Sequence, residues 1–313
     1  MAKVLISEKV NAIGPELIAA KGHEAIQMPS IELTDLKKYI KDADALLVRI
    51  LPITRELMES APNLKIISKH GVGVDNIDLE AAKDLGIIVT TTPDANGLSV
   101  AEHTVALMLS LAKNIVPVSN AYRETGFGAK NYREGMEISG KTLGVIGCGK
   151  IGSRTATMCR NGFNMKVLVY DPYIDTVPEG CELVTDIERI FKEADVITAH
   201  CFLSPETTHI IGEPELAMMK QTAILLNCAR GPVVDEAALI KALQENKIAA
   251  AGLDVTESEP LDPASPLFAM KDRVIVTPHY APTTREAATR VSRIAAENIV
   301  NCLAGKAVVG RKA

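Results

Sequence analysis

The sequence has no long hydrophobic segment. Its longest apolar run, VALMLSLA at residues 105–112, is far shorter than the roughly 20 residues that a helix needs to cross a bilayer. The first residues, MAKVLISEKVNA, reach Glu8 and Lys9 after only a few apolar positions, so they lack the core of a signal peptide. We therefore expect a cytoplasmic protein with no membrane partner.

Blocks of like charge are also missing. The formal net charge is −5, 23% of the residues are charged, and no five like charges follow one another. This pattern lacks the basic surface that binds nucleic acid or anionic membranes, so we expect neither as a partner. The apolar content of 47% suits well-packed cores, and 313 residues predict about two domains.

The cysteines show no metal-binding pattern. The chain has six, at positions 148, 159, 181, 201, 228 and 302, with no CxxC pair and no histidine at a ligand spacing. We expect no metal site and interpret the cysteines as buried free thiols.

Short apolar strands alternate with helical segments along the first ninety residues. Strands are expected to begin near residues 3, 23, 44, 65 and 87. Thr34, Thr54 and Asp78 are expected to cap helices between them, because each precedes a periodic apolar segment. This alternation predicts parallel β-α-β units.

A second block of the same kind follows a break at TTPDANGL, residues 91–98, after which a long helix is expected from about 99 to 123. The strands expected in this block are TLGVIG, KVLVY, DVITAH, AILLNC, AAAGLDV and RVIVT. Another irregular stretch, PHYAPTT at 278–284, precedes an amphipathic helix over 285–303. The predicted fold class is α/β, with two doubly wound parallel sheets.

A glycine-rich motif begins the second block. Gly147, Gly149 and Gly152 fit GxGxxG between an apolar strand and a helical pattern, with Lys150 and Ile151 inside the motif. The glycines allow a tight turn, close approach of backbone to a pyrophosphate and packing of helix on strand. Asp171, about twenty residues later, can accept the ribose hydroxyls. This context predicts NAD as cofactor, although Arg154 and Lys166 leave NADP as an alternative.

Three polar residues each come just after a strand of the second block: Arg230 in NCARG, Glu259 in DVTESEP and His279 in TPH. Ligands of open α/β sheets bind outside the carboxyl ends of the strands, so all three can face a bound nicotinamide. Taken singly, each has a plainer structural interpretation as a capping or surface residue.

The chain resembles the NAD-dependent D-2-hydroxyacid dehydrogenases, a family that includes phosphoglycerate dehydrogenase, glyoxylate and hydroxypyruvate reductases and D-lactate dehydrogenase. The likeness covers nearly the whole chain, through GVGVDNID at 71–78, SVAEH at 99–103 and the motifs named above. The resemblance implies a Rossmann NAD-binding domain over 99–284 inserted into a flavodoxin-like substrate-binding domain, which would comprise 1–98 and a returning C-terminal helix in 285–313. It also implies a homodimer through the helix near 99–123.

The resemblance assigns Arg230 to the substrate carboxylate and 2-oxygen, and pairs Glu259 with His279 as acid/base residues. The chemistry agrees, because reducing a carbonyl creates an alkoxide that needs a proton, and histidine titrates near neutral pH. A carboxylate beside the imidazole stabilises its charged form and fixes its tautomer. A guanidinium can address carboxylate and carbonyl oxygens together.

Further positions follow from the resemblance. Thr207, Cys228 and Asp254 are expected to contact the cofactor, with Asp254 either holding the nicotinamide carboxamide or merely capping its loop. The amides of Val72, Gly73 and Val74 would form a nest for the substrate carboxylate, and Asn96 lies at a position near the substrate.

Substrate specificity stays open at the sequence level. Arg49, with Lys69 and His70, follows strands of the first sheet and could meet a second anionic group on the substrate, whereas Ile50 and Leu51 favour a smaller or less polar acid. Two positions depart from the pattern of the family. Phe202 stands where the family usually has proline, near the expected adenine side of the cofactor, and Tyr280 stands where it usually has a small residue after the histidine equivalent to His279. The alternative function is an NAD(H)-sensing binding protein or corepressor of the same fold.

Overall fold

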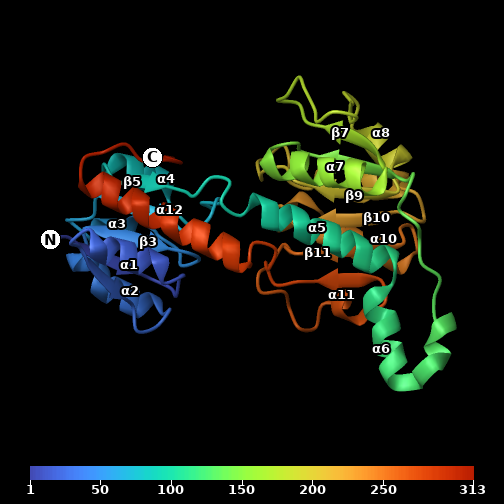
Figure 1. Cartoon of the computed structure of the whole chain (residues 1–313), viewed down its shortest axis with the longest axis horizontal. Coiled ribbons are helices and arrows are strands. Elements are labelled where there is room, and N and C mark those ends of the chain that lie inside the picture. The colour runs from blue at the N-terminus through green and yellow to red at the C-terminus, as the bar shows by residue number, and fades with distance from the viewer. The chain divides into compact units, whose positions relative to one another are not determined.

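The computed structural model describes all 313 residues, and none of its helices is long and apolar enough to cross a membrane. Contacts divide the chain into two compact units. Unit 1 comprises Met1–Asn96 and Thr283–Ala313, and unit 2 comprises Gly97–Pro282. Each unit contains its own sheet (Figure 1).

Unit 1 is built on a five-stranded sheet in the order β2-β1-β3-β4-β5, and all its strand pairs are parallel. This is the flavodoxin-like order. Its strands are β1 (Lys3–Ile6), β2 (Glu24–Gln27), β3 (Ala45–Val48), β4 (Ile66–Lys69) and β5 (Ile88–Thr90). Its helices are α1 (Ile13–Ala20), α2 (Leu33–Tyr39), η1 (Ile40–Asp42), α3 (Arg55–Glu59), α4 (Leu79–Asp84) and α12 (Arg285–Leu303).

Helices cover both faces of this sheet because successive strand residues point to opposite sides. Val4 packs with α1 and α12, through Ile18 and Ile299, whereas the next residue, Leu5, packs on the other face with Leu36 of α2. The C-terminal helix α12 is therefore part of the first unit's core, although the whole second unit separates it from β5 in the sequence.

Unit 2 is built on a seven-stranded parallel sheet in the order β12-β11-β10-β9-β6-β7-β8. Its strands are β6 (Thr142–Ile146), β7 (Lys166–Tyr170), β8 (Glu182–Leu183), β9 (Val196–Ala199), β10 (Ile224–Asn227), β11 (Ala250–Leu253) and β12 (Val274–Val276). Its helices are α5 (Gly97–Ala112), α6 (Ile115–Thr125), η2 (Gly126–Asn131), α7 (Lys150–Phe163), α8 (Glu188–Glu193), α9 (Glu213–Met218), η3 (Gly231–Val233), α10 (Glu236–Gln244) and α11 (Pro266–Ala269).

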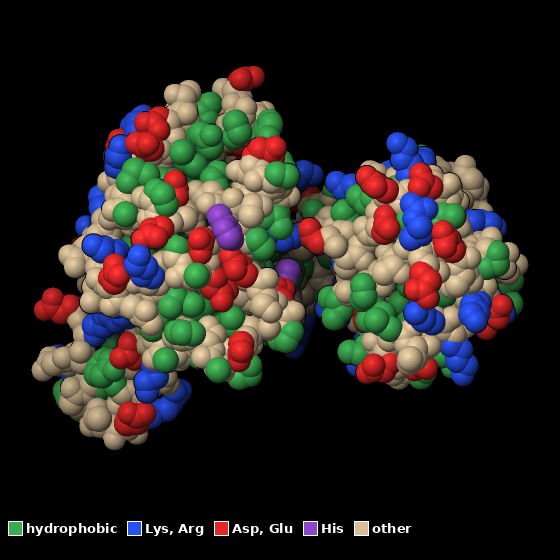
Figure 2. Space-filling model, turned by 180° about the vertical axis from the view of Figure 1, so that it is seen from behind, with side chains coloured by type: hydrophobic (Ala, Val, Ile, Leu, Met, Phe, Trp, Pro, Cys, Tyr) green, Lys and Arg blue, Asp and Glu red, His purple; other side chains and the backbone are tan.

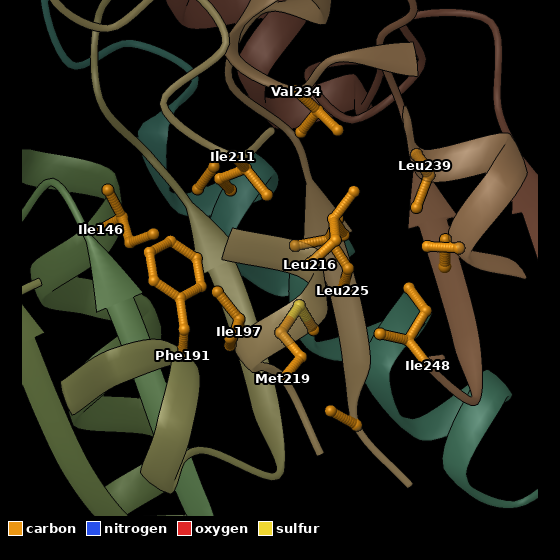
Figure 3. Packing of buried hydrophobic residues seen from close by; sticks show 14 of the residues in the cluster. Ile146, Phe191, Ile197, Ile211, Leu216, Met219, Leu225, Val234, Leu239 and Ile248 are labelled. Atoms are coloured by element: carbon orange, nitrogen blue, oxygen red, sulfur yellow. The ribbon is translucent and has the colours of Figure 1, made fainter. Parts of the chain in front are cut away.

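The second sheet is also covered on both faces. Figure 3 shows one of its cores, where Phe191 of α8, Leu216 of α9 and Leu239 of α10 pack toward Leu225 of β10. The opposite core contains residues from α5 and α7. Strand order changes direction between β6 and β9, which is the kind of switch point where open α/β sheets bind ligands.

The structure confirms the α/β class, the two parallel sheets and all of the expected strands. Thr54 and Asp78 cap α3 and α4 as expected, but Thr34 does not cap a helix. Helix α2 already begins at Leu33, after Glu32, and has no side-chain cap.

The single helix expected from 99 to 123 is wrong. Asn114 adopts the left-handed conformation, with φ 50°, and separates α5 from α6. Its side-chain amide donates to the carbonyl of Glu134 at 2.8 Å, which stabilises the break. The two-residue strand β8 was not expected, since it carries no apolar run.

The cysteines are all free, but only Cys148, Cys159 and Cys228 are buried. Burial raises the pKa of Cys148 to about 11 and that of Cys228 to about 12, so both thiols stay protonated at neutral pH. On the face shown in Figure 2, side chains of both charge signs are interspersed over each unit.

Candidate active site

The glycine-rich loop connects β6 to α7 at the switch point of the second sheet. Gly147 has φ 88°, and a Cβ there would lie 2.5 Å from the backbone nitrogen of Cys201. A Cβ on Gly152 would lie 2.1 Å from the carbonyl oxygen of Gly147. These two glycines therefore permit the turn and the close packing of α7, as the motif requires.

Gly149, by contrast, faces open space. Apart from Gly149 itself and its two neighbours in the chain, no residue has an atom within 4 Å of the position that a Cβ would occupy there, and Gly149 is the N-cap of the 14-residue helix α7. An accessible helix N-terminus with backbone exposed at a glycine suits a pyrophosphate group. The chain's residues here fit a dinucleotide.

Asp171 follows β7 and lies beside the glycine-rich loop. Its carboxylate accepts hydrogen bonds from the amide of Cys148 at 2.8 Å and from that of Tyr173 at 3.0 Å. Each oxygen keeps a further lone pair, so the carboxylate can also accept ribose hydroxyls. The exposed ring of Tyr173, two residues after Asp171, has its centroid 6.0 Å from that of the exposed ring of Phe202.

Glu259 and His279 form a direct pair. The Nδ1 atom of His279 lies 2.9 Å from Oε2 of Glu259, and both side chains are nearly half exposed, at 48% and 42%. Partial burial alone would raise the pKa of Glu259, but the hydrogen bond and charge of His279, with the charge of Arg230, lower it overall. The carboxylate therefore stays ionised, and Nε2 is the imidazole atom that remains available for a substrate.

The loop of His279 is anchored to Asp254, whose carboxylate is buried. It accepts from the amides of Tyr280 at 2.7 Å and Ala281 at 2.9 Å, and from the hydroxyl of Thr277 at 2.5 Å. The backbone of His279 is also bonded to the Asp254 carbonyl and adopts φ 51°. The loop-capping alternative for Asp254 is thus present, and its cofactor contact stays a prediction.

Arg230 lies at the carboxyl end of β10, just before η3. Asn227 donates to its carbonyl at 2.9 Å, and its charge contributes to the lowered pKa of Glu259. Gly231 allows this loop to press against the next one, because a Cβ there would lie 1.9 Å from the Thr256 carbonyl oxygen. The structure therefore holds the loops of Arg230 and Glu259 in close contact.

The other expected cofactor residues of unit 2 differ in accessibility. Thr207 caps its own loop, since its hydroxyl accepts from the Ser204 amide at 2.8 Å and donates to the Phe202 carbonyl at 2.7 Å. Cys228 is buried, so its cofactor contact stays a prediction. Lys150 is exposed and Ile151 partly buried, both in the first turn of α7.

In unit 1, the loop that contains Arg49 is organised by a buried carboxylate that was not expected from the sequence. Glu8 accepts from the amides of Arg49 at 2.8 Å, Ile50 at 2.7 Å and Leu51 at 2.9 Å. The Arg49 guanidinium donates to the carbonyl of Lys9 at 3.2 Å, and its residue is exposed. Arg49 can therefore still present a positive charge.

Lys69 and His70 are engaged inside unit 1. The amine of Lys69 donates to the Arg49 carbonyl and to the side-chain oxygen of Asn76. His70 lies 2.8 Å from the Ser292 hydroxyl, and burial, with the charge of Arg49, lowers the pKa of His70 to about 4. The imidazole is therefore neutral at pH 7, which weakens the suggestion that it meets an anion.

The remaining candidates of unit 1 lie on its loops. Val72 is exposed, while Gly73 and Val74 are partly buried, in the turn between β4 and α4. Asn96 is partly buried at the last position of the first segment of unit 1. Their roles in binding stay predictions.

In each unit, one residue that supports a candidate loop was not predicted from the sequence. His103 of α5 lies 3.1 Å from the Thr277 hydroxyl and 3.6 Å from the Asp254 carboxylate, so it supports the His279 loop. Glu8 organises the Arg49 loop as described above. The signal for His103 was its place in SVAEH, and the signal for Glu8 was its position directly after a strand. No three or more His, Cys, Asp or Glu side chains in the chain are grouped to hold a metal ion.

Comparisons with known proteins show which family the chain resembles. Residues 105–281 match the family described as "D-isomer specific 2-hydroxyacid dehydrogenase, NAD binding domain". A D-3-phosphoglycerate dehydrogenase of Methanocaldococcus jannaschii is 44% identical over 310 residues, which cover 98% of this chain and 58% of that protein. The chain thus spans little more than half the length of this relative.

Two further proteins are similar over most of their length. A glyoxylate reductase of Thermofilum pendens is 42% identical over 293 residues, which cover 91% of this chain and 85% of that protein. The solved structure of a D-lactate dehydrogenase from Aquifex aeolicus, complexed with NAD and lactic acid, has a TM-score of 0.84 at 31% identity. The match covers 97% of this chain and 96% of that one.

Proposed function

Since the chain belongs to the D-isomer-specific 2-hydroxyacid dehydrogenase family, we propose that it transfers a hydride between NAD(H) and a small 2-oxo or (R)-2-hydroxy acid. The observation that carries this proposal is the pair of Glu259 and His279, 2.9 Å apart. Both follow strands of the sheet that also carries the glycine-rich loop, and their loops lie at the strands' carboxyl ends.

The cofactor would be held by the loop of Gly147, Gly149 and Gly152, with Asp171 accepting the ribose hydroxyls. Lys150, Ile151, Thr207, Cys228 and Asp254 are further expected contacts. When bound, a nicotinamide dinucleotide supplies the hydride for reduction or accepts it in the reverse direction. A carboxylate at position 171 favours NAD over NADP, because it would repel a 2′-phosphate.

The chain's own residues handle the proton and the carboxylate. In reduction, His279 donates a proton from Nε2 to the oxygen of the former carbonyl, because its Nδ1 is occupied by Glu259. The ionised Glu259 stabilises the imidazolium before this transfer. Arg230 binds the substrate carboxylate and 2-oxygen through its planar donors, which also polarises the carbonyl.

Additional substrate contacts are proposed for Arg49, Asn96 and the amides of Val72, Gly73 and Val74. The exposed guanidinium of Arg49 supports an acidic substrate, and the exposed Ile50 beside it supports a small one. The related proteins described above are named for different acids. The substrate panel therefore has to include acids with a second anionic group as well as small acids without one.

The decisive experiment measures NADH oxidation with glyoxylate, hydroxypyruvate, pyruvate, phosphohydroxypyruvate and sulfopyruvate. Turnover of at least one acid, lost in His279→Gln, is the expected result. NADH binding without turnover of any acid would favour the NAD(H)-sensing alternative, which no relative described above supports by its name.

A homodimer is also proposed, through α6 and η2 rather than through the whole segment 99–123. Helix α5 is largely buried in unit 2, whereas Ile115, Tyr122 and Phe127 are 53%, 58% and 78% exposed. They border a hollow of about 470 Å³. Sedimentation velocity with Phe127→Asp tests this: dissociation is expected, and an unchanged dimer would place the interface elsewhere.

The cytoplasmic location of the protein stays a prediction.

A further inference from the structure

A second histidine-carboxylate pair lies outside the proposed acid/base pair. Nε2 of His209 lies 2.7 Å from Oε1 of Glu257, and Nδ1 lies 3.9 Å from the carboxylate of Asp235. Both members of the pair are partly exposed, at 46% and 36%, and neither has a role in the reaction described above. Exposed ion pairs contribute little to stability, so stability alone does not explain this arrangement.

His209 is held in an unusual backbone conformation. Its φ is 54°, in the left-handed region that non-glycine residues adopt at an energetic cost. The conformation is fixed from both sides, since the His209 amide donates to the Pro232 carbonyl at 2.8 Å and the next-but-one residue, Ile211, pairs with Val234. The backbone thus directs the imidazole at the loop that contains Glu257.

Glu257 is bonded to a third segment as well. Its carboxylate accepts from the amide of Glu236 at 3.3 Å, and its own amide donates to the Glu236 carboxylate at 3.2 Å. Glu236 is the first residue of α10, so its amide is one that the helix itself leaves without a partner. Glu257 therefore connects the start of α10 with the segment of His209.

The segments joined in this way follow three neighbouring strands of the sheet, β9, β10 and β11. The first contains Thr207, the second contains Arg230 and the third contains Glu259, two residues after Glu257. Because Gly231 already presses against Thr256, a shift of Glu257 would move the loops of Arg230 and Glu259 together.

We propose that His209 and Glu257 are positioning residues, which lock the three loops at the carboxyl ends of β9, β10 and β11 so that Arg230 and Glu259 keep their places. The effect of this pair on catalysis rests on the proposed function. The effect on how firmly the three loops are held does not depend on it. A displacement of reacting groups by about 1 Å can cost as much as about a hundredfold in rate. A partial loosening should cost on the order of tenfold.

The test uses substitutions that separate the effect of the side-chain pair from the effect of the backbone conformation at His209. His209→Gly removes the imidazole, and glycine adopts φ 54° without cost, so no backbone strain is added. Glu257→Ala removes the carboxylate, whereas Glu257→Gln keeps an acceptor of the same shape. The matched control is Lys241→Ala, which breaks the exposed 2.6 Å pair of Lys241 with Glu213 between α9 and α10 of the same unit.

We expect His209→Gly and Glu257→Ala each to lower kcat about tenfold with the best acid of the panel, with NADH affinity changed much less. The double variant should lose no more than either single variant, and Glu257→Gln should recover part of the rate. Melting temperatures should fall by less than about 3 °C. Lys241→Ala should match the wild type.

Hydrogen exchange of the whole protein provides a readout that does not depend on activity. The amides of residues 256–259, 231 and 233–236 should exchange about tenfold faster in both variants, and at the wild-type rate in Lys241→Ala. Unchanged exchange in these segments, or equal kinetic losses in the control, would overturn the positioning role. If the wild type reduces none of the acids, the proposed function fails while the exchange data still decide this inference.

Discussion

The two units differ in how they use several polar side chains at the carboxyl ends of their strands. In unit 1, Glu8, Lys69 and His70 bond to their own unit's backbone or to buried side chains. In unit 2, Glu259 and His279 pair with each other and stay nearly half exposed. A place after a strand therefore brings a residue to the right edge of a sheet, but its internal partners decide whether it is available for chemistry.

The largest effect is expected when the exposed His279 is replaced. His279→Gln should lower kcat by about 10² to 10⁴, because glutamine fits the space but cannot transfer the proton. NADH affinity, measured by fluorescence titration, should stay within about threefold of wild type, since the glycine-rich loop is untouched. Equal turnover by the two proteins would remove His279 from its role and with it the contrast between the units.

The partly buried His70 should instead make stability depend on pH. Burial lowers the pKa of His70 to about 4 from its ordinary value of 6.5. The unfolded chain therefore binds a proton between these values that the folded chain does not, so the free energy of unfolding falls as pH decreases from about 6.5 to 4. This single group accounts for about 3 kcal/mol at most.

Urea unfolding at pH 7 and pH 4 measures this effect in the wild type and in His70→Gln. The variant should lose less stability between the two pH values, because glutamine does not titrate. If both proteins show the same pH dependence, His70 is not buried in its neutral form, and the contrast with His279 is weaker than the structure indicates.

Alanine substitutions at Gly149 and Gly162, two glycines of α7 or its N-cap, test where unit 2 binds the cofactor. Gly149→Ala should lower NADH affinity about tenfold by overpacking against the pyrophosphate, with little change in melting temperature. Gly162→Ala, in the same helix and also without neighbours within 4 Å, should leave NADH affinity unchanged and raise stability by about 0.5 to 1 kcal/mol. Similar NADH affinities in the two variants would contradict the placement of the cofactor.

An effect of similar size is expected at Asp171, whose carboxylate both bonds to its own unit's backbone and stays able to bind a ligand. Asp171→Ala should lower the ratio of kcat/KM for NADH over NADPH about tenfold, because a charged acceptor for the ribose hydroxyls is lost. Some of the loss will fall on both cofactors, since the variant also frees the Cys148 amide from its 2.8 Å bond. An unchanged ratio would defeat the ribose assignment.

Much of unit 2 could be predicted because its signals are local. The spacing of Gly147, Gly149 and Gly152 reflects contacts within one turn, and the strands appear as short apolar runs. Errors arose where local signals were ambiguous: the apolar pattern continues across Asn114, although its left-handed backbone breaks the helix, and Thr34 is followed by a helical pattern that in fact begins before it.

Hydrogen bonds between segments that are distant in the sequence could not be predicted in the same way. Glu8 and the loop of Arg49 are joined by three backbone amides, and a sequence gives no direct sign of which carboxylate will meet them. The same holds for His209 and Glu257, whose partnership depends on loops after different strands.

The sequence by itself determined the two α/β blocks, the dinucleotide motif and the short list of residues able to carry acid/base chemistry. These follow from periodicity, turn chemistry and side-chain type, which are properties of neighbouring residues. Only the tertiary structure decided which charged groups stay available, because desolvation and hydrogen bonding depend on segments that are distant in the sequence. The contrast between a neutral, partly buried His70 and an exposed, paired His279 is a consequence of that packing.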